Sequence, residues 1–124
     1  MIGGTVMPEN ELYFIGKVSK KLNISISTLR YYDKEGLLPL IKRDKNGNRL
    51  FDELDLEILY CITCFKNAGM TLKQIKSYFL LYEKGDSTKE ARNVLLNKQL
   101  EKLDEQLMKL EQAKQVLLKK IEEL

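Results

Sequence analysis

The sequence of 124 residues has no histidine and no tryptophan, and it contains only two cysteines and two prolines. Without histidine the chain lacks the commonest general base, the Ser-His and Cys-His nucleophile pairs, and every histidine metal ligand. Two cysteines argue against a disulfide framework. No uncharged stretch reaches the roughly 18 residues that a transmembrane helix needs. These absences predict a cytoplasmic protein that is not an enzyme and has no metal, no cofactor and no membrane partner.

The net charge of +3 conceals an uneven distribution along the chain. From Lys17 to Arg49 there are nine basic and three acidic residues, which gives that segment a net charge of +6. The remainder after Arg49 is close to neutral. This distribution favours an N-terminal part that binds a polyanion and a C-terminal part with a structural role. Charge alone leaves a solvated basic surface as the alternative.

Two short helices are expected at the start of the basic segment. Apolar residues recur at helical spacing over residues 14–22, and Asn23 ends that helix. Ser25 is placed as the N-cap of a second helix over residues 26–35, which Gly36 ends. Two short helices separated by about three residues are typical of a helix-turn-helix.

A basic hairpin is expected next. Asn46-Gly47 is the strongest short-range hairpin signal, because a type I′ turn needs positive φ at both of its central residues. The basic residues around this turn are Lys42, Arg43, Lys45 and Arg49. A helix-turn-helix followed by such a hairpin forms a winged module, in which the hairpin reaches a groove or phosphates beside the second helix.

Three further helices are expected. Asp52 is predicted to cap a helix that runs to Ala68, and capping boxes at residues 71–74 and 87–90 are predicted to open two more. The predicted buried face of the first of these helices consists of Leu54, Ile58, Cys61, Ile62 and Phe65. The last helix runs to the end of the sequence without a glycine or proline.

The last helix carries a heptad pattern, in which apolar residues recur in alternating steps of four and three. The pattern is interrupted only by Lys114 and comprises Leu96, Leu100, Leu103, Leu107, Leu110, Leu117, Ile121 and Leu124. Such a seam needs a partner helix, and the chain has no second heptad segment of matching length. The sequence therefore predicts a homodimer formed through this helix.

The strings IGKVSKKLNISISTLRYYDKEGLLP and RDKNGNRLFDELDLEIL resemble the mercury-resistance regulator (MerR) family of bacterial transcription factors. TLRYYDKEGLL, at residues 28–38, is the most specific part of a resemblance that extends over about residues 13–124. The resemblance implies a mostly helical fold with a winged helix-turn-helix module and a long C-terminal helix that dimerises as an antiparallel coiled coil. The expected parts are a flexible arm (1–12), a DNA-binding domain (13–82, with its helix-turn-helix at about 15–35 and its wing at about 39–51), and a linker with the dimerisation helix (83–124).

The resemblance also implies a function. Such homodimers bind palindromic double-stranded promoter DNA and distort it, so that a badly spaced promoter becomes readable by RNA polymerase. The protein would act on the polymerase indirectly, as an activator or a repressor. The wing departs from the family pattern, because Asn48 and Leu50-Phe51 stand where tyrosines are common.

The exposed side of the second helix and the wing supply the predicted DNA contacts. These are Ser27, Thr28, Arg30, Tyr31 and Lys34 on the helix, with Arg43 and Arg49 in the wing. Hydroxyls in the first helical turn suit phosphates or base edges, and an arginine can fork to guanine or to a phosphate. Lys17, Lys20 and Lys21 are interpreted either as phosphate contacts or as a solvated face.

Cys61 and Cys64 have the spacing of a redox or zinc motif, but they lie about two turns inside a predicted helix. The helix N-terminus that lowers a thiol pKa is therefore distant, and a zinc site would need two more ligands. We interpret Cys61 as a small core residue. Cys64 is a possible sensor thiol, because carbonyl-responsive members of the family carry a lone cysteine in a segment resembling ITCFKNAGM. An electrophile or another stress signal is the corresponding input.

Two other functions remain open on the sequence. An excisionase-like architectural protein uses a similar winged module to bend DNA without regulating transcription. A coiled-coil interaction protein would leave the basic segment incidental. Binding to a palindromic promoter and transcription from it distinguish these alternatives from a regulator.

Overall fold

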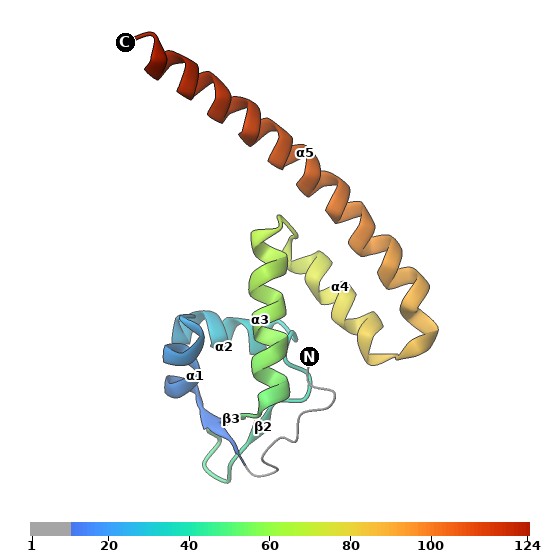
Figure 1. Cartoon of the computed structure of the whole chain (residues 1–124). Coiled ribbons are helices and arrows are strands. Elements are labelled where there is room, and N and C mark those ends of the chain that lie inside the picture. Colours follow the sequence, from blue (N-terminus) through green and yellow to red (C-terminus); the bar gives the residue numbers. More distant parts are fainter. Residues whose placement is uncertain (1–10) are drawn as a thin grey trace. The chain divides into compact units, whose positions relative to one another are not determined.

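The computed structural model describes residues 11–124, so most of the predicted N-terminal arm lies outside the described residues. Its elements are β1 (Tyr13–Phe14), α1 (Ile15–Leu22), α2 (Ile26–Lys34), β2 (Lys42–Arg43), β3 (Arg49–Phe51), α3 (Glu53–Asn67), α4 (Leu72–Glu83), the 3-10 helix η1 (Asp86–Thr88) and α5 (Lys89–Glu122) (Figure 1). The chain divides into two compact units, Met1–Phe65 and Lys66–Leu124. The predicted mostly helical fold, with a winged helix-turn-helix followed by a long helix, is confirmed.

The helix-turn-helix of the first unit is formed by α1 and α2. Asn23 ends α1 in the left-handed region, at φ 56°, a conformation that its short polar side chain tolerates. Ser25 is the N-cap of α2, as predicted, and its side chain accepts a hydrogen bond from the Thr28 amide. The inner faces of the two helices contribute the fully buried Val18 and Leu29. Burial of such side chains is the main stabilising contribution of this helix pair.

A small antiparallel sheet with the strand order β1-β3-β2 completes the winged module. Arg43 of β2 is paired with Arg49 of β3, and Tyr13 of β1 is paired with Phe51 of β3. Phe51 is fully buried, whereas both residues of β2 are exposed. The inner edge of the hairpin is therefore anchored in the core, and its outer strand faces solvent.

The turn of the hairpin differs from the predicted type I′. Only Gly47 has a positive φ, of 83°, and Asn46 does not adopt one. The amide of Asp44 donates to the Asn48 carbonyl oxygen at 2.9 Å, which encloses a three-residue loop ending in the left-handed glycine. The Asp44 carboxylate accepts hydrogen bonds from the amides of Asn48 and Asn46, and these bonds lower the pKa of Asp44. This side-chain acceptor favours the wider turn over the two-residue form.

The N-terminus of α3 is closed by two reciprocal hydrogen bonds. The Asp55 amide donates to the Asp52 carboxylate at 2.8 Å, as the predicted cap requires, and the Asp52 amide donates to the Asp55 carboxylate at 2.9 Å. Burial is the main cause that raises the pKa of Asp55, to about 6, and the neighbouring Asp52 charge adds to it. Although partial burial raises the pKa of Asp52, hydrogen bonds from the Asp55 amide and from Lys42 lower it overall.

The buried face of α3 differs from the predicted one. Leu56, Leu59 and Ile62 are its most buried apolar residues. Of the residues predicted for this face only Ile62 is fully buried, and Leu54, Ile58, Cys61 and Phe65 are half-buried. Two apolar stripes run along this helix side by side, so periodicity alone does not identify the inner one.

The second unit begins with α4, whose start was predicted correctly. Thr71 and Gln74 form a full capping box, and the inner face of the helix contains the buried Ile75 and Phe79. Gln99 of α5 donates to the carbonyl oxygen of Ala68 at 2.8 Å and so satisfies a backbone acceptor just before α4.

The predicted capping box at residues 87–90 is wrong. Residues Asp86–Thr88 form η1 instead, and α5 begins at Lys89 without a side-chain cap. The buried Thr88 hydroxyl lies 2.7 Å from the Leu81 carbonyl oxygen, and Arg92 Nε donates to the same hydroxyl at 3.0 Å. The hydroxyl of Thr88, the residue before α5, is therefore used in these contacts and does not cap the helix. The 3-10 helix η1 leads directly into α5.

The long helix α5 has 34 residues, or about 51 Å at 1.5 Å per residue. Its first half packs against α4, and Leu96 and Leu103 are half-buried there. From Asp104 to the last residue every side chain is exposed, including five of the eight predicted seam residues. Figure 1 shows this part of α5 extending beyond α4. Within residues 11–124 no helix combines the length and apolarity needed to cross a membrane.

The reciprocal carboxyl pair predicts a pH dependence of stability. The pKa of Asp55 is about 6 in the folded protein, above its ordinary value of 3.8, so the folded state binds this proton more tightly than the unfolded state does. The resulting contribution to the free energy of unfolding is present at about pH 4 and decreases as the pH rises through about 6. We expect wild type to lose about 1–2 kcal/mol over this range and Asp55→Asn to lose much less. Urea unfolding at fixed protein concentration measures both, with Asp44→Asn as a control that keeps the wild-type trend. An unchanged trend in Asp55→Asn would contradict the assignment.

Candidate nucleic-acid interface

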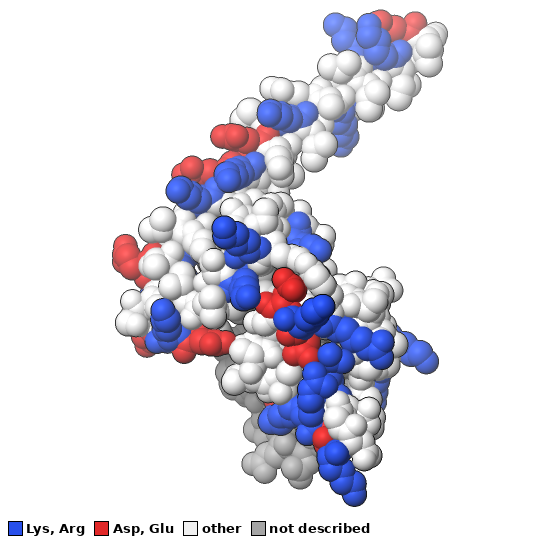
Figure 2. Space-filling view, turned by 180° about the vertical axis from the view of Figure 1, so that it is seen from behind, with Lys and Arg blue, Asp and Glu red and all other residues white. Residues whose placement is uncertain are grey.

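The predicted contact residues of α2 lie on its outer face. Ser27, Arg30 and Lys34 are exposed, Tyr31 is 46% exposed and Thr28 is half-buried. The inner face contains Leu29 and Tyr32, both buried, as the helical spacing predicts. Figure 2 shows Lys and Arg side chains gathered over the N-terminal unit, in the lower part of the view. The outer face of α2 therefore belongs to a strongly basic surface.

Hydroxyl groups cluster at the first turn of α2. The Ser25 hydroxyl donates to Thr28 Oγ1 at 2.7 Å, and it lies 3.2 Å from the Ser27 hydroxyl. The same Ser25 oxygen accepts the Thr28 amide. The cap thus orients both predicted contact residues of this turn, at the end of the helix where backbone N–H groups favour an anion.

A pocket of about 330 Å³ lies between the start of α1, helix α2 and the wing. Its lining residues are Phe14, Ile15, Arg30, Gly47, Asn48 and Arg49. The pocket brings Arg30 of α2 and Arg49 of β3, predicted from separate motifs, to the walls of one hollow. Arginine residues beside the apolar Phe14 and Ile15 are suited to a sugar-phosphate segment, because an arginine can fork to phosphate oxygens.

An acidic residue on α2 binds both wing arginines. Asp33 Oδ2 accepts a hydrogen bond from Arg49 Nε at 2.7 Å and another from Arg43 Nη2 at 3.0 Å. Arg43 Nη1 also donates to the Gly47 carbonyl oxygen at 2.9 Å. Sequence reasoning missed Asp33. The available signal was its position, since it is one of only three acidic residues in the basic segment.

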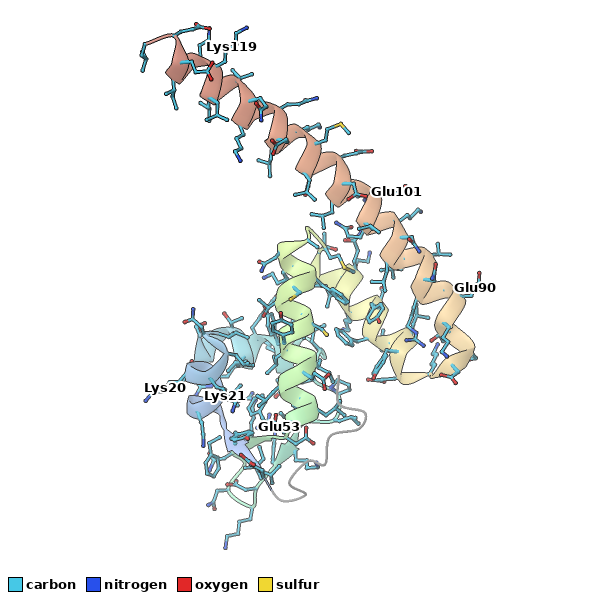
Figure 3. The ribbon with its side chains drawn as sticks, in the orientation of Figure 1. Lys20, Lys21, Glu53, Glu90, Glu101 and Lys119 are labelled. Atoms are coloured by element: carbon cyan, nitrogen blue, oxygen red, sulfur yellow. The ribbon has the colours of Figure 1, made fainter. Side chains whose placement is uncertain are left out.

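Two of the three lysines of α1 lie over one aromatic ring. Lys17 Nζ and Lys21 Nζ lie 5.1 and 5.3 Å from the centroid of the Tyr13 ring, a distance at which a cation is attracted to the ring face. The Tyr13 hydroxyl donates to Glu53 at 2.6 Å. Figure 3 shows Lys20 and Lys21 projecting from α1 and Glu53 at the start of α3. Lys17 and Lys21 are therefore held by Tyr13, whereas Lys20 projects outward.

The two cysteines differ in their surroundings. Cys64 is exposed and Cys61 is half-buried, and both are free thiols. Burial, and next the proximity of Cys64 and Glu57, raises the pKa of Cys61. A side-chain hydrogen bond with Cys64 raises the pKa of Tyr60. Across residues 11–124, no three side chains of the types that ligate metals come together as a site.

Two family patterns match this chain. The pattern of MerR helix-turn-helix family regulatory proteins matches residues 13–81, and a second pattern, described as MerR, DNA binding, matches residues 56–120. An uncharacterized helix-turn-helix transcriptional regulator of Haemophilus influenzae is 44% identical over 98 residues, which are 79% of this chain and 73% of the relative. The regulator AdhR of Bacillus subtilis is 37% identical over 91 residues, which are 73% of this chain and 65% of AdhR.

Solved structures give the same result. HiNmlR, described as a MerR family regulator lacking the sensor domain and solved bound to promoter DNA, is 40% identical with a TM-score of 0.82, and the match covers 90% of this chain and 88% of HiNmlR. A MerR family regulator from Bacillus thuringiensis is 35% identical with a TM-score of 0.81, over 92% of this chain and all of that chain. The fold and the sequence together define a winged helix-turn-helix regulator, and the chain belongs to the MerR family.

Proposed function

We propose that the protein is a cytoplasmic transcriptional regulator that binds a palindromic promoter as a homodimer and distorts the DNA to control initiation. The observation that carries the proposal is the basic hollow of the N-terminal unit, where Arg30 and Arg49 converge between α2 and the wing. HiNmlR, which is similar over most of this chain, was solved on promoter DNA. Base edges are read by α2 and phosphates by the wing and the first helical turn, which together set the register on the duplex.

Dimerisation is proposed to occur through α5. The apolar side chains of Leu107, Leu110, Leu117 and Ile121 are each more than half exposed, and they recur at heptad spacing over the part of α5 that extends beyond α4. A stripe of this kind is covered by a second helix in coiled coils, and a second copy of the chain supplies one of the same length and pattern. An antiparallel pair sets two winged modules on the two halves of a palindrome. The division into a DNA-binding part, residues 13–82, and a dimerisation part, residues 83–124, stays a prediction.

Control of transcription is proposed to follow from DNA distortion. Two modules at a separation fixed by rigid helices bind best to a duplex whose bend and twist match that separation. The free energy of binding therefore stabilises one DNA shape, and the spacing of promoter elements seen by RNA polymerase changes with it. The protein thus acts on RNA polymerase indirectly, by changing the promoter DNA that the polymerase binds.

Substitutions on the α2–wing surface test the proposed DNA face. We expect Arg30→Ala and Tyr31→Phe to weaken binding to a promoter duplex selected by the wild-type protein, with a loss of about 1–3 kcal/mol for the arginine. Arg43→Ala should weaken binding to the selected duplex and reduce the salt slope by about 0.9 per lost phosphate contact. Fluorescence anisotropy at several salt concentrations measures these effects, with Lys98→Ala on α5 as the control. Equal isotherms for all four variants and wild type would contradict the assignment.

A charge on the seam tests the dimer. Leu110→Glu places a carboxylate among the apolar residues of the coiled coil and should shift the protein from dimer to monomer at micromolar concentration. Gln112→Glu adds the same charge two residues away and should remain dimeric. Light scattering coupled to gel filtration measures both masses. A monomeric wild-type chain, or a fully dimeric Leu110→Glu, would exclude this interface.

The signal is proposed to be an electrophile that modifies Cys64. Cys64 is exposed near the end of α3 and is accessible to a reagent. Cys61 is half-buried, and burial raises its pKa, which disfavours its thiolate. Tyr60 lies one helical turn before Cys64 on α3 and is also exposed. A bulky adduct on Cys64 would change this exposed side of α3 and shift the arrangement of the DNA-binding modules.

Substitution of each cysteine by serine tests whether modification of Cys64 is the signal. Treatment with a small aldehyde or quinone should change reporter transcription for wild type and Cys61→Ser, and it should leave Cys64→Ser unchanged. Mass spectrometry of the treated protein should find the adduct first on Cys64. A full response in Cys64→Ser would show that the signal enters elsewhere, without affecting the proposed DNA binding.

A further inference from the structure

The wing is tied to α2 by a single carboxylate oxygen. Asp33 Oδ2 binds Arg49 Nε at 2.7 Å and Arg43 Nη2 at 3.0 Å, and the Asp33 side chain is only 13% exposed. The Arg49 side chain is 21% exposed, so its pair with Asp33 is screened less by salt than a surface pair, whereas the Arg43 side chain is 47% exposed and its pair is screened more. Charge-assisted hydrogen bonds to arginine are directional in both pairs. The two contacts therefore fix both the distance and the orientation of the wing relative to α2.

The two arginines lie on the two strands of the hairpin. Arg43 of β2 is the register partner of Arg49 of β3, so Asp33 holds the hairpin across its width. Arg43 Nη1 also donates to the Gly47 carbonyl oxygen, which extends the connection into the loop. Lys42 and Asp52 form a second contact at the base of the wing, at 3.2 Å, but the lysine side chain is 61% exposed and this pair is correspondingly weaker.

The negative charge of Asp33 weakens binding to DNA, so its presence on this surface calls for another role, and positioning the wing is one. A carboxylate on a surface that meets phosphates lowers the electrostatic attraction for any DNA. It also occupies guanidinium N–H groups that could otherwise reach phosphates. What the carboxylate provides is a fixed arrangement of Arg43 and Arg49 beside Arg30, and a fixed arrangement discriminates between duplexes whereas mobile cations do not.

We propose that Asp33 is a positioning residue that determines specificity, lowering affinity for DNA in general and holding the wing where only the matching promoter satisfies both α2 and the wing. The inference rests on the proposed function, and it holds that one side chain, Asp33, fixes the position of the wing relative to α2.

The experiment compares two substitutions that change charge equally. Asp33→Asn removes the carboxylate, and Glu35→Gln removes an exposed carboxylate at the C-cap of α2 that pairs with neither wing arginine among the described residues. Each variant of the full chain is titrated with a duplex selected by the wild-type protein from a random library and with a scrambled duplex of equal composition. Glu35→Gln should bind both duplexes more tightly by a similar factor. Asp33→Asn should bind the scrambled duplex more tightly and lower the specificity ratio about tenfold, and Asp33→Glu should restore most of that ratio.

A DNA-free measurement separates failure of this inference from failure of the proposed function. In the free protein, hydrogen exchange at the wing amides of Asp44 and Gly47 should be faster in Asp33→Asn than in wild type or Glu35→Gln. Equal exchange in the three proteins, or an unchanged specificity ratio in Asp33→Asn, would overturn the positioning role. A wild-type protein that selects no sequence would refute the proposed function, and the exchange rates would still decide whether Asp33 orders the wing.

Discussion

The ion pairs of Asp33 are the constraint on which the proposed DNA surface depends. A winged module reads DNA only if its helix and its hairpin meet one duplex together, yet the hairpin has strands of two and three residues and an exposed outer edge. Such a short hairpin is marginally stable by itself. Phe51 anchors its inner strand in the core, and Asp33 holds the paired arginines of both strands against α2. Local packing and one carboxylate thus convert a weak hairpin into a fixed part of the surface.

The second unit imposes a different constraint. Gln99, Thr88 and the capping box at Thr71 satisfy the backbone around the short connections, so the first half of α5 is fixed against α4 by both polar and apolar contacts. Beyond Leu103 the helix has no partner within the unit, and its leucines are exposed at heptad spacing. The protein therefore combines a proposed DNA surface formed within one chain with a helix whose exposed apolar face we propose is covered by a second copy of the chain.

Much of the fold could be predicted from the sequence because its determinants are local. Ser25, Asp52 and Thr71 cap the helices that they were predicted to cap, and the heptad residues from Leu96 to Ile121 lie along one uninterrupted helix, with Leu124 beyond its end. The errors arose where two local signals competed or where the decisive partner was distant. Asp44 favours the three-residue turn over the one typical of Asn46-Gly47. Ser87, the cap of the predicted box at residues 87–90, lies inside η1, where the Thr88 hydroxyl bonds back to Leu81. The contacts of Asp33 join residues 10 and 16 positions apart, and no periodicity encodes them.

The central claim is that the outer face of α2 and the wing form one DNA-binding surface. Amide chemical shifts of the isotope-labelled full chain, recorded while the selected promoter duplex is added, test it most directly. The account predicts that the largest changes occur together, with a single affinity, at residues 27–34 and 43–49, and that the exposed end of α5 changes little. Changes concentrated on α5, or changes on α2 without changes in the wing, would contradict it.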